Sequence, residues 1–318
     1  MTHQMNQTIF VEILILGFEN LSDYKIPLFV FLLIIYTCTC IENLLIIFLV
    51  NKSPHLHSPM YYLISNLLFC ELVYTTNLVP LMLHDILLGR GVISYLGCVI
   101  QLNVLGGVSD VESFLLTLMS YDRYLAICKP LRYSALIHNR LCLYLLILFW
   151  LFSFLSVAVV FYLLINLKFC GPVSIDHFHC DYTALLSMAC SDIGVLMIYV
   201  LVISITLTVG PFLLIILSYI FIIIAILRIK SSSGRQKAFS TCSSHLLVVT
   251  LYFGTLFSLY VMPRSSHYLQ LYKGLSFVYF AVTPLLNPII YTLRNQDIHK
   301  AMKMTISEVK QYCTTNIH

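Results

Sequence analysis

The chain has 318 residues and a formal net charge of +4, with 59% hydrophobic and only 10% charged residues. Soluble domains carry about 25% charged residues, so this composition excludes an ordinary soluble fold. Lipid has to cover much of the apolar surface. We expect lipid as a partner, and no nucleic acid.

Residues 1–25 are expected to form a tail outside the membrane. Met1–Gln7 has no basic region, and the apolar stretch Ile9–Phe18 is short and interrupted by Glu12. These features do not fit a cleavable signal peptide, so the first membrane span is predicted to act as an uncleaved signal anchor.

Seven apolar runs follow, each long enough to cross a bilayer, for which a helix needs about 20 residues. They cover Ile26–Val50, Pro59–Leu83, Leu96–Ser120, Leu141–Ile165, Ile193–Leu227, Ala238–Met262 and Leu271–Leu293. The fifth run is the longest and is expected to extend past the bilayer on the inner side. The sequence therefore predicts an all-α integral membrane protein, a single seven-helix bundle over residues 1–318.

The placement of basic residues predicts the orientation, because inner loops carry an excess of Lys and Arg. With the N-terminus outside, 13 of the 18 Lys and Arg residues fall in inner segments. Residues 294–318 then form a cytoplasmic tail, in which we expect a short amphipathic helix. Asn6 starts a glycosylation sequon in the outer tail. The predicted location is the plasma membrane, with several passes.

Four carboxylates lie inside the predicted spans, at Glu42, Glu71, Asp110 and Glu112. An ionisable residue at membrane depth is costly and usually faces the bundle interior or a wet cavity. Glu71 and Glu112, with Asn43, are expected to meet in a polar pocket that holds water or a cation. Protonated carboxyl groups that only tie helices together are the alternative.

Helix geometry orders the polar side chains of the third span. At about 100° per residue, Glu112 and Arg123 lie about 20° apart and share the inward face. Asp110 points about 160° away from Glu112, toward the fourth and fifth spans. We expect it near a polar group there, such as Ser156, Ser204 or Thr206.

Motifs recur along nearly the whole chain. PMYY opens the second span at Pro59, MSYDRYLAIC closes the third at Met119–Cys128, and KPLRY follows at Lys129–Tyr133. KAFSTCSSHL opens the sixth span at Lys237–Leu246, and PLLNPIIY ends the seventh at Pro284–Tyr291. In this order the set resembles the odorant receptors, a family of rhodopsin-like G-protein-coupled receptors. The strings in the third and sixth spans point to that family in particular.

The resemblance implies a coupling region at the inner ends of the helices. Asp122 and Arg123 would form an ion pair that Arg123 leaves on activation to meet the G protein. Pro288 removes a backbone donor and is expected to bend the seventh helix, while Asn287 can bond the freed carbonyl groups. The predicted coupling and switch residues are Asp122, Arg123, Tyr124, Tyr219, His245, Asn287, Pro288 and Tyr291.

The second outer loop holds most of the remaining cysteines and histidines. The resemblance implies the disulfides Cys98–Cys180 and Cys170–Cys190, whereas four cysteines alone allow three pairings. His177 and His179, with the aspartates at 176 and 181, could bind a metal, but a solvated polar loop is the simpler interpretation. We expect no metal and no cofactor.

The sequence departs from the family pattern at three places. Glu42 precedes Asn43 where the family usually has Gly, and Glu71 replaces the usual Asp. In the sixth span, the family's Phe-Tyr-Gly reads Tyr252-Phe253-Gly254. That exchange removes a hydroxyl group at the expected switch position and puts its usual role in doubt.

The ligand pocket is predicted in the outer halves of the third, fifth, sixth and seventh spans. Its mostly apolar candidates suit small, hydrophobic, volatile molecules. They are Leu102, Leu105, Gly106, Ser109, Asp110, Ile203, Leu207, Phe257, Tyr260 and Phe277. Plain helix packing is the alternative for each aliphatic position. Tyr260 is the strongest candidate for a hydrogen bond to ligand, and Asp110 is expected to be a neutral carboxyl group.

The predicted function is an odorant receptor that activates a stimulatory G protein, with trafficking chaperones as further candidate partners. It is not expected to be an enzyme, since no HExxH or GxSxG string lies in a span. The alternative is an ion or solute transporter that uses the intramembrane carboxylates. Paired repeats and broken helices, which many transporters have, are missing from the sequence.

Overall fold

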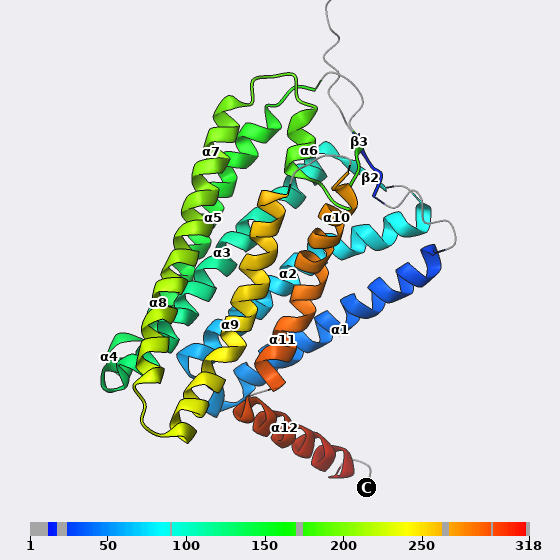
Figure 1. Ribbon diagram of the computed structural model, residues 1–318. Coiled ribbons are helices and arrows are strands. Elements are labelled where there is room, and N and C mark those ends of the chain that lie inside the picture. Colours follow the sequence, from blue (N-terminus) through cyan, green and yellow to red (C-terminus); the bar gives the residue numbers. More distant parts are fainter. Residues whose placement is uncertain are drawn as a thin grey trace, which may run out of the picture.

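The computed structural model describes residues 12–17, 24–89, 91–169, 174–262, 267–293 and 295–315. Within these ranges, seven helices are long and apolar enough to cross a membrane. They are α1 (Lys25–Lys52), α2 (Pro59–Leu88), α3 (Tyr95–Cys128), α5 (Asn139–Ile165), α7–η3–α8 (Gly194–Leu227), α9 (Ser232–Val261) and α10–η4–α11 (Leu269–Leu293). The predicted seven-helix bundle is confirmed (Figure 1).

Shorter elements lie at the two ends of the bundle. The elements η1 (Pro54–Leu56), η2 (Pro130–Arg132) and α4 (Tyr133–Leu136) lie at one end, and α6 (Tyr182–Ser187) lies at the other. α12 (Gln296–Thr315) follows the last span. It packs against α1 and η1, where Ile298 and Ala301 are fully buried and Lys52 pairs with Glu308 at 2.5 Å. At 20 residues this helix is longer than the short one predicted.

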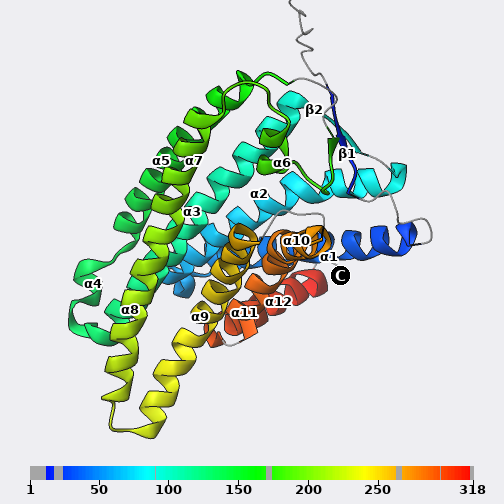
Figure 2. The ribbon, with the colours of Figure 1, turned by 45° about the horizontal axis from the view of Figure 1, so that its top comes forward.

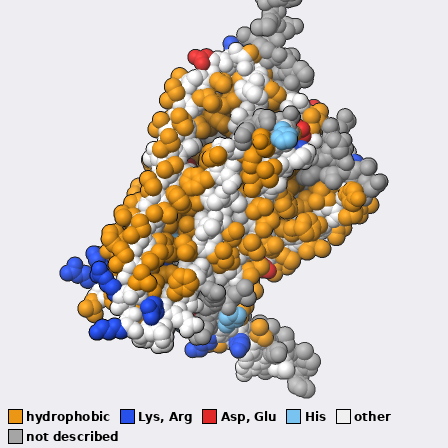
Figure 3. Space-filling view, viewed as in Figure 1, with side chains coloured by type: hydrophobic (Ala, Val, Ile, Leu, Met, Phe, Trp, Pro, Cys, Tyr) orange, Lys and Arg blue, Asp and Glu red, His pale blue; other side chains and the backbone are white. Residues whose placement is uncertain are grey.

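The apolar side chains divide between the bundle interior and its outer surface. α2 and α3 pass through the middle of the bundle (Figures 1 and 2), and about half of the residues in their most apolar stretches are buried. In the most apolar stretch of α5 only 17% of the residues are buried, and Leu155 is 68% exposed. Orange apolar atoms accordingly cover much of the visible side of the bundle in Figure 3. This distribution fits helices whose outer faces contact lipid.

Two helices contain a wide turn that the sequence analysis did not predict. π-Helical turns occur at η3 (Ile205–Val209) and η4 (Val278–Val282). Each ends two residues before a proline, Pro211 or Pro284. Proline lacks the N–H group that the carbonyl four residues earlier would accept, and its ring crowds that carbonyl, so the preceding turn widens. Pro288, which was expected to bend the last span, lies inside the regular helix α11 (Thr283–Leu293).

A small sheet closes one end of the bundle, which we call the sheet end. β1 (Glu12–Ile15) pairs antiparallel with β2 (Gly91–Ser94) and parallel with β3 (Ser174–Ile175). The side chains of Ile13 and Ile15 in β1 are buried. A Cβ at Gly17 would lie 2.6 Å from the backbone of His177, so only glycine permits this close approach. Part of the predicted outer tail is therefore an ordered cover over the bundle.

A disulfide joins this cover to the bundle. Cys98 in the first turn of α3 bonds to Cys180, with a Cα–Cα distance of 5.6 Å, and both residues are fully buried. This bond confirms the first predicted pairing. Cys190 is also disulfide-bonded, but Cys170 lies outside the described residues, as does Asn6.

We expect that Cys98→Ser and Cys180→Ser each prevent delivery to the cell surface, and that the double variant is no worse than either single one. Loss of a native disulfide typically costs about 2–5 kcal/mol, and one shared bond can be lost only once. Surface staining of intact cells measures this, with Cys38→Ser, a free exposed cysteine, as the control. Additive losses would show that the two cysteines act separately.

Candidate functional site

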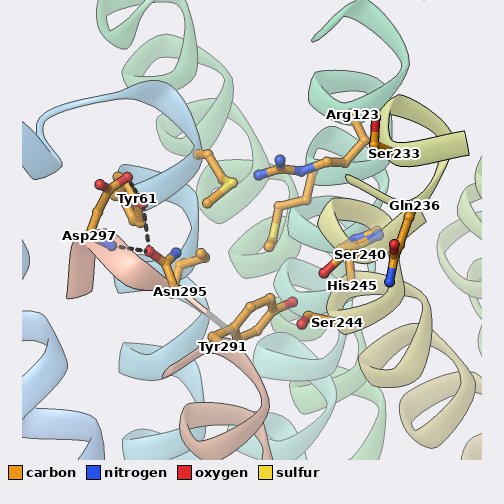
Figure 4. A pocket seen from close by; sticks show the side chains of 13 residues that line it. Tyr61, Arg123, Ser233, Gln236, Ser240, Ser244, His245, Tyr291, Asn295 and Asp297 are labelled. Carbon is orange, nitrogen blue, oxygen red and sulfur yellow. Dashed lines mark hydrogen bonds between the residues drawn. The ribbon is translucent and has the colours of Figure 1, made fainter. Parts of the chain in front are cut away.

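A cavity of about 670 Å³ lies at the end of the bundle opposite the sheet, which we call the cavity end. Residues of α2, α3, α9, α11 and α12 line it (Figure 4). Arg123 extends into the space, Tyr61 lies on one side with the start of α12, and His245 lies on the other side with α9. Three predicted coupling residues, Arg123, His245 and Tyr291, therefore share one cavity.

The Arg123 guanidinium forms the predicted ion pair, with Nη2 3.7 Å from Asp122 Oδ2. Tyr133 of α4 donates a 2.7 Å hydrogen bond to the other oxygen of Asp122. Burial, and then the Asp122 carboxylate, raise the pKa of the Tyr133 hydroxyl and keep it a donor. Tyr133 is the last residue of the KPLRY string. Its hydrogen bond to Asp122 could not be predicted from that string and is seen only in the structure. Tyr124 lies beside this site with the Lys129 ammonium 5.7 Å from its ring centre.

His245 connects three helices at the wall of the cavity. Its Nε2 lies 3.2 Å from the Leu116 carbonyl oxygen of α3, and its Nδ1 lies 2.7 Å from the Tyr219 hydroxyl of α8. A carbonyl can only accept, so Nε2 carries the hydrogen and the bare Nδ1 accepts from Tyr219. The two rings stack with an angle of 9° between their planes. Neutral His245 thereby ties the ends of α3, α8 and α9 together.

Above the cavity, four helices bring together the residues of the predicted polar pocket and Asn287. Glu71 of α2 accepts a hydrogen bond from the Asn287 amide of α11, and both residues are almost fully buried. Asn43 of α1 donates to the Pro284 carbonyl at 3.3 Å. The buried Glu112 carboxyl group of α3 interacts electrostatically with Glu71. That Glu71 and Glu112 share one polar pocket stays a prediction.

Ser109 is the centre of a hydroxyl cluster toward the sheet end. Its Oγ lies 2.9 Å from the Tyr74 hydroxyl of α2 and 3.2 Å from the Tyr279 hydroxyl of η4. Its carbonyl accepts a 2.8 Å bond from Tyr252 of α9, whose hydroxyl also lies 3.1 Å from Ser113 Oγ. One residue of α3 thus connects three other helices.

This cluster explains the exchanged Tyr252-Phe253 pair. Phe253 is 1% exposed and packs against Phe212 and Phe257, so the expected switch position is wholly apolar. The hydroxyl group is not lost from α9, because the preceding Tyr252 directs it to α3. The exchange of Tyr252 and Phe253 could be read from the sequence, but only the structure shows that Tyr252 bonds to Ser109.

The structure places most predicted ligand residues between the helices of the sheet-end half. Leu105 and Leu207 are buried, and six others are half-buried: Leu102, Ser109, Asp110, Ile203, Phe257 and Phe277. Gly106 is exposed. These locations agree with the predicted region, and the ligand role of each residue remains a prediction.

Tyr260 does not have the enclosed position that was expected of it. Its side chain is 57% exposed, whereas Phe253, which has nearly the same helical phase, is buried. Tyr260 lies in the last turn of α9, where its neighbour Leu259 is the residue that packs into the core, so the phase of Tyr260 alone does not enclose it. Helical periodicity gives a direction but not the depth of the surrounding helices.

Asp110 points to the fourth span, as its helical phase predicted. Its Oδ2 lies 3.2 Å from the Ser156 Oγ of α5. Thr206, another expected neighbour, is exposed and bonds to Val202 of its own helix. The sequence identified the direction of Asp110, and the structure selected one partner among three.

The histidines of the segment between α5 and α6 are buried rather than solvated. His177 and His179 are 2% and 5% exposed, and their ring centres lie 4.2 Å apart. Asp181 caps α6 through the Ala184 N–H and accepts a 2.8 Å bond from Tyr272. The interpretation as a solvated polar loop is therefore wrong, because β1 and α10 (Leu269–Phe277) cover and contact this segment. No group of three metal-ligating side chains occurs among the described residues.

A seven-helix bundle with an Asp-Arg pair at one end of its third span has the architecture of a G-protein-coupled receptor. The family model for olfactory receptors matches residues 31–309. Mouse olfactory receptor 2B6 is 42% identical over 304 residues, which cover 96% of this chain and 97% of that protein. Human olfactory receptor 6N1 is 41% identical over 298 residues, 94% of this chain and 96% of that protein.

The chain belongs to the olfactory receptor family. Members of this family are odorant receptors of the plasma membrane that signal through G proteins, and they are not enzymes. The alternative of a transporter is not favoured.

We expect Tyr252→Phe to raise basal cyclic AMP about fivefold per receptor at the surface. The variant removes the α9–α3 bond, and about 1 kcal/mol of resting-state stabilisation corresponds to a change of about that size. Thr250→Val is the matched control, because its exposed hydroxyl bonds only to Leu246 of its own helix. A fall in basal signal would show that the Tyr252 bond stabilises the active state instead.

Proposed function

We propose that this receptor binds a small, mostly hydrophobic volatile molecule in its sheet-end half and activates a stimulatory G protein at the cavity around Arg123. One observation carries this proposal: Arg123, His245 and Tyr291 line a single cavity. The candidate ligand residues lie in the other half of the bundle. The Ser109 cluster lies on the ligand side, and the Glu71–Asn287 bond lies between the two regions.

The proposed orientation puts the sheet outside the cell and the cavity in the cytoplasm. In Figure 3, Lys and Arg gather at the end of the bundle opposite the sheet. Such an excess is typical of cytoplasmic loops. A basic rim there also suits the approach of a G protein by electrostatic steering.

Activation in this proposal opens the cavity end. Ligand binding would favour an arrangement in which α8 and α9 move away from α3. The His245–Leu116 bond then breaks, because it joins α9 to α3 directly. Arg123 leaves Asp122 and meets the G protein, while the buried Tyr291 hydroxyl, which has no hydrogen-bond partner among the described residues, is available to a new one.

The ligand half has the composition of a site for small apolar molecules. Six of its ten candidate residues are leucine, isoleucine or phenylalanine, and Ser109 and Asp110 would supply the polar contacts. Pockets of this kind obtain affinity from apolar burial and orientation from a few polar groups.

The remaining partners belong to the same proposal. Lipid would cover the exposed apolar faces, and trafficking chaperones would assist delivery to the membrane of sensory cilia. Asn6 would carry a glycan on the outer side.

Replacing Arg123 with Ala should abolish the odorant-dependent rise in cyclic AMP while surface staining stays detectable. The side chain is 12% exposed and points into the cavity, so its loss removes a charge from the coupling site rather than from the core. The measurement is cyclic AMP in cells with and without the stimulatory Gα subunit.

Arg140→Ala is the matched control, since Arg140 is an exposed basic residue at the start of α5. It should signal like the wild type. Undiminished signalling by Arg123→Ala would remove Arg123 from coupling. A response that persists without the stimulatory subunit would contradict the choice of G protein.

A further inference from the structure

The hydrogen bonds around Asp110 indicate which chemical group of a ligand it would bind. It lies in α3 within a group formed with Ser156 of α5 and Tyr199 of α7. Tyr199 donates to the Ser156 carbonyl at 3.2 Å, so its hydroxyl hydrogen is already used. The carboxyl group therefore depends on Ser156 for its contact with the protein.

Counting hydrogens indicates the form of this carboxyl group. Ser156 Oγ lies 2.8 Å from the Ser153 carbonyl oxygen and 3.2 Å from Asp110 Oδ2. A hydroxyl group has one hydrogen, and a carbonyl oxygen can only accept, so the hydrogen goes to the shorter contact with Ser153. The longer contact is then a bond that Asp110 donates from a protonated Oδ2 to Ser156 Oγ.

The charges of the surrounding helices agree with a neutral Asp110. α3 contains one basic residue, Arg123, 13 positions away, or about 20 Å along the axis. In α5 the one basic residue is Arg140, about 24 Å from Ser156 by the same measure. The fifth span, Gly194–Leu227, contains no Lys, Arg or His. An ionised Asp110 would lack a counter-charge, which is unfavourable at this depth.

Gly106 leaves space on the face of α3 that also carries Asp110, one turn away. Oδ1 has no hydrogen-bond partner among the described residues, and Asp110 is only half-buried. Gly106 lies one turn toward the sheet end, is exposed, and would place a Cβ near only one atom, 3.8 Å away on Val157. The neighbouring Gly107 is different, because its Cβ would lie 3.2 Å from Ser153 Oγ.

We propose that Asp110 is a neutral hydrogen-bond acceptor that selects ligands carrying a hydroxyl group, namely small aliphatic alcohols over ketones of the same skeleton. The alcohol donates to Oδ1 while Oδ2 keeps its bond to Ser156. A ketone has no donor, so its oxygen would face another acceptor unless the carboxyl hydrogen left Ser156. This inference rests on the proposed ligand region and names the ligand class for it.

The test uses two substitutions at Asp110 that separate the effect of a hydrogen-bond acceptor from the effect of a negative charge. Asp110→Asn keeps a carbonyl acceptor and replaces the donating hydroxyl with an amide N–H, so it reproduces the neutral acid. It should keep the alcohol response within about threefold. Asp110→Leu has no acceptor and should lose the preference for alcohol over ketone by about tenfold or more, because a buried donor would stay unpaired.

Two readouts are measured on the full-length receptor. One is the cyclic AMP dose–response to octan-2-ol, octan-2-one and octane, normalised to surface staining. The other is the thermal stability of the purified receptor with each compound, which reports binding without a G protein. Thr206→Val, which removes an exposed hydroxyl that bonds within its own helix, is the matched control and should match the wild type.

Gly106→Ala provides a second, independent variant. The added methyl group occupies the space beside Asp110 without a clash, so the receptor should fold and should bind octan-2-ol at least about tenfold more weakly. Thermal stabilisation by octan-2-ol equal to that of the wild type would contradict access to Asp110 past Gly106.

The outcomes separate this inference from the proposed function. Stabilisation by the alcohol without cyclic AMP would refute the proposed coupling and support the ligand class. Signalling with the same alcohol-to-ketone ratio in wild type and Asp110→Leu would overturn the ligand class and leave the coupling intact. Loss of the alcohol response in Asp110→Asn would also overturn it, because an ionised carboxylate would then be required.

Discussion

Hydrocarbon offers no hydrogen bonds, and this constraint governs the rest of the structure. Backbone groups have to be satisfied within each span, which leaves the helix as the element that crosses the membrane here. Side chains then sort by face, as α5 illustrates: Ser153 and Ser156 are buried against α3, whereas Phe154 and Leu155 are more than 60% exposed. Several polar side chains on the outer faces, such as Thr206 and Thr250, bond to a carbonyl of their own span.

Inward polar groups lie at three levels between the proposed ligand region and the cavity. The Ser109 cluster lies on the ligand side, the Glu71–Asn287 bond lies in the middle, and His245 lies at the cavity. Each of these bonds joins different helices, so a movement of one helix has to break or replace some of them. A bound ligand can therefore shift the balance between two arrangements of the bundle without a single connecting pathway.

Two prolines change which side chains of their helices face the bundle interior. The wide turns η3 and η4 precede Pro211 and Pro284, and each changes the angular position of the residues around it. Thr206, which lies inside η3, faces outward, although it was an expected neighbour of Asp110. Predictions from a regular period of 3.6 residues were correct for α3, which is regular over all of its 34 residues. They were incomplete in the fifth span, where the period is interrupted.

The amino-acid sequence by itself determined the seven spans and the direction of Asp110 in α3. These properties follow from local composition and helical geometry, which do not depend on distant parts of the chain. The three-stranded sheet, the partner of Tyr252 and the burial of His177 and His179 were decided by the tertiary structure. The sheet joins strands at residues 12–15, 91–94 and 174–175, and the Tyr252–Ser109 bond spans 143 positions. Pairings at such separations depend on how the helices pack, and no local pattern encodes them.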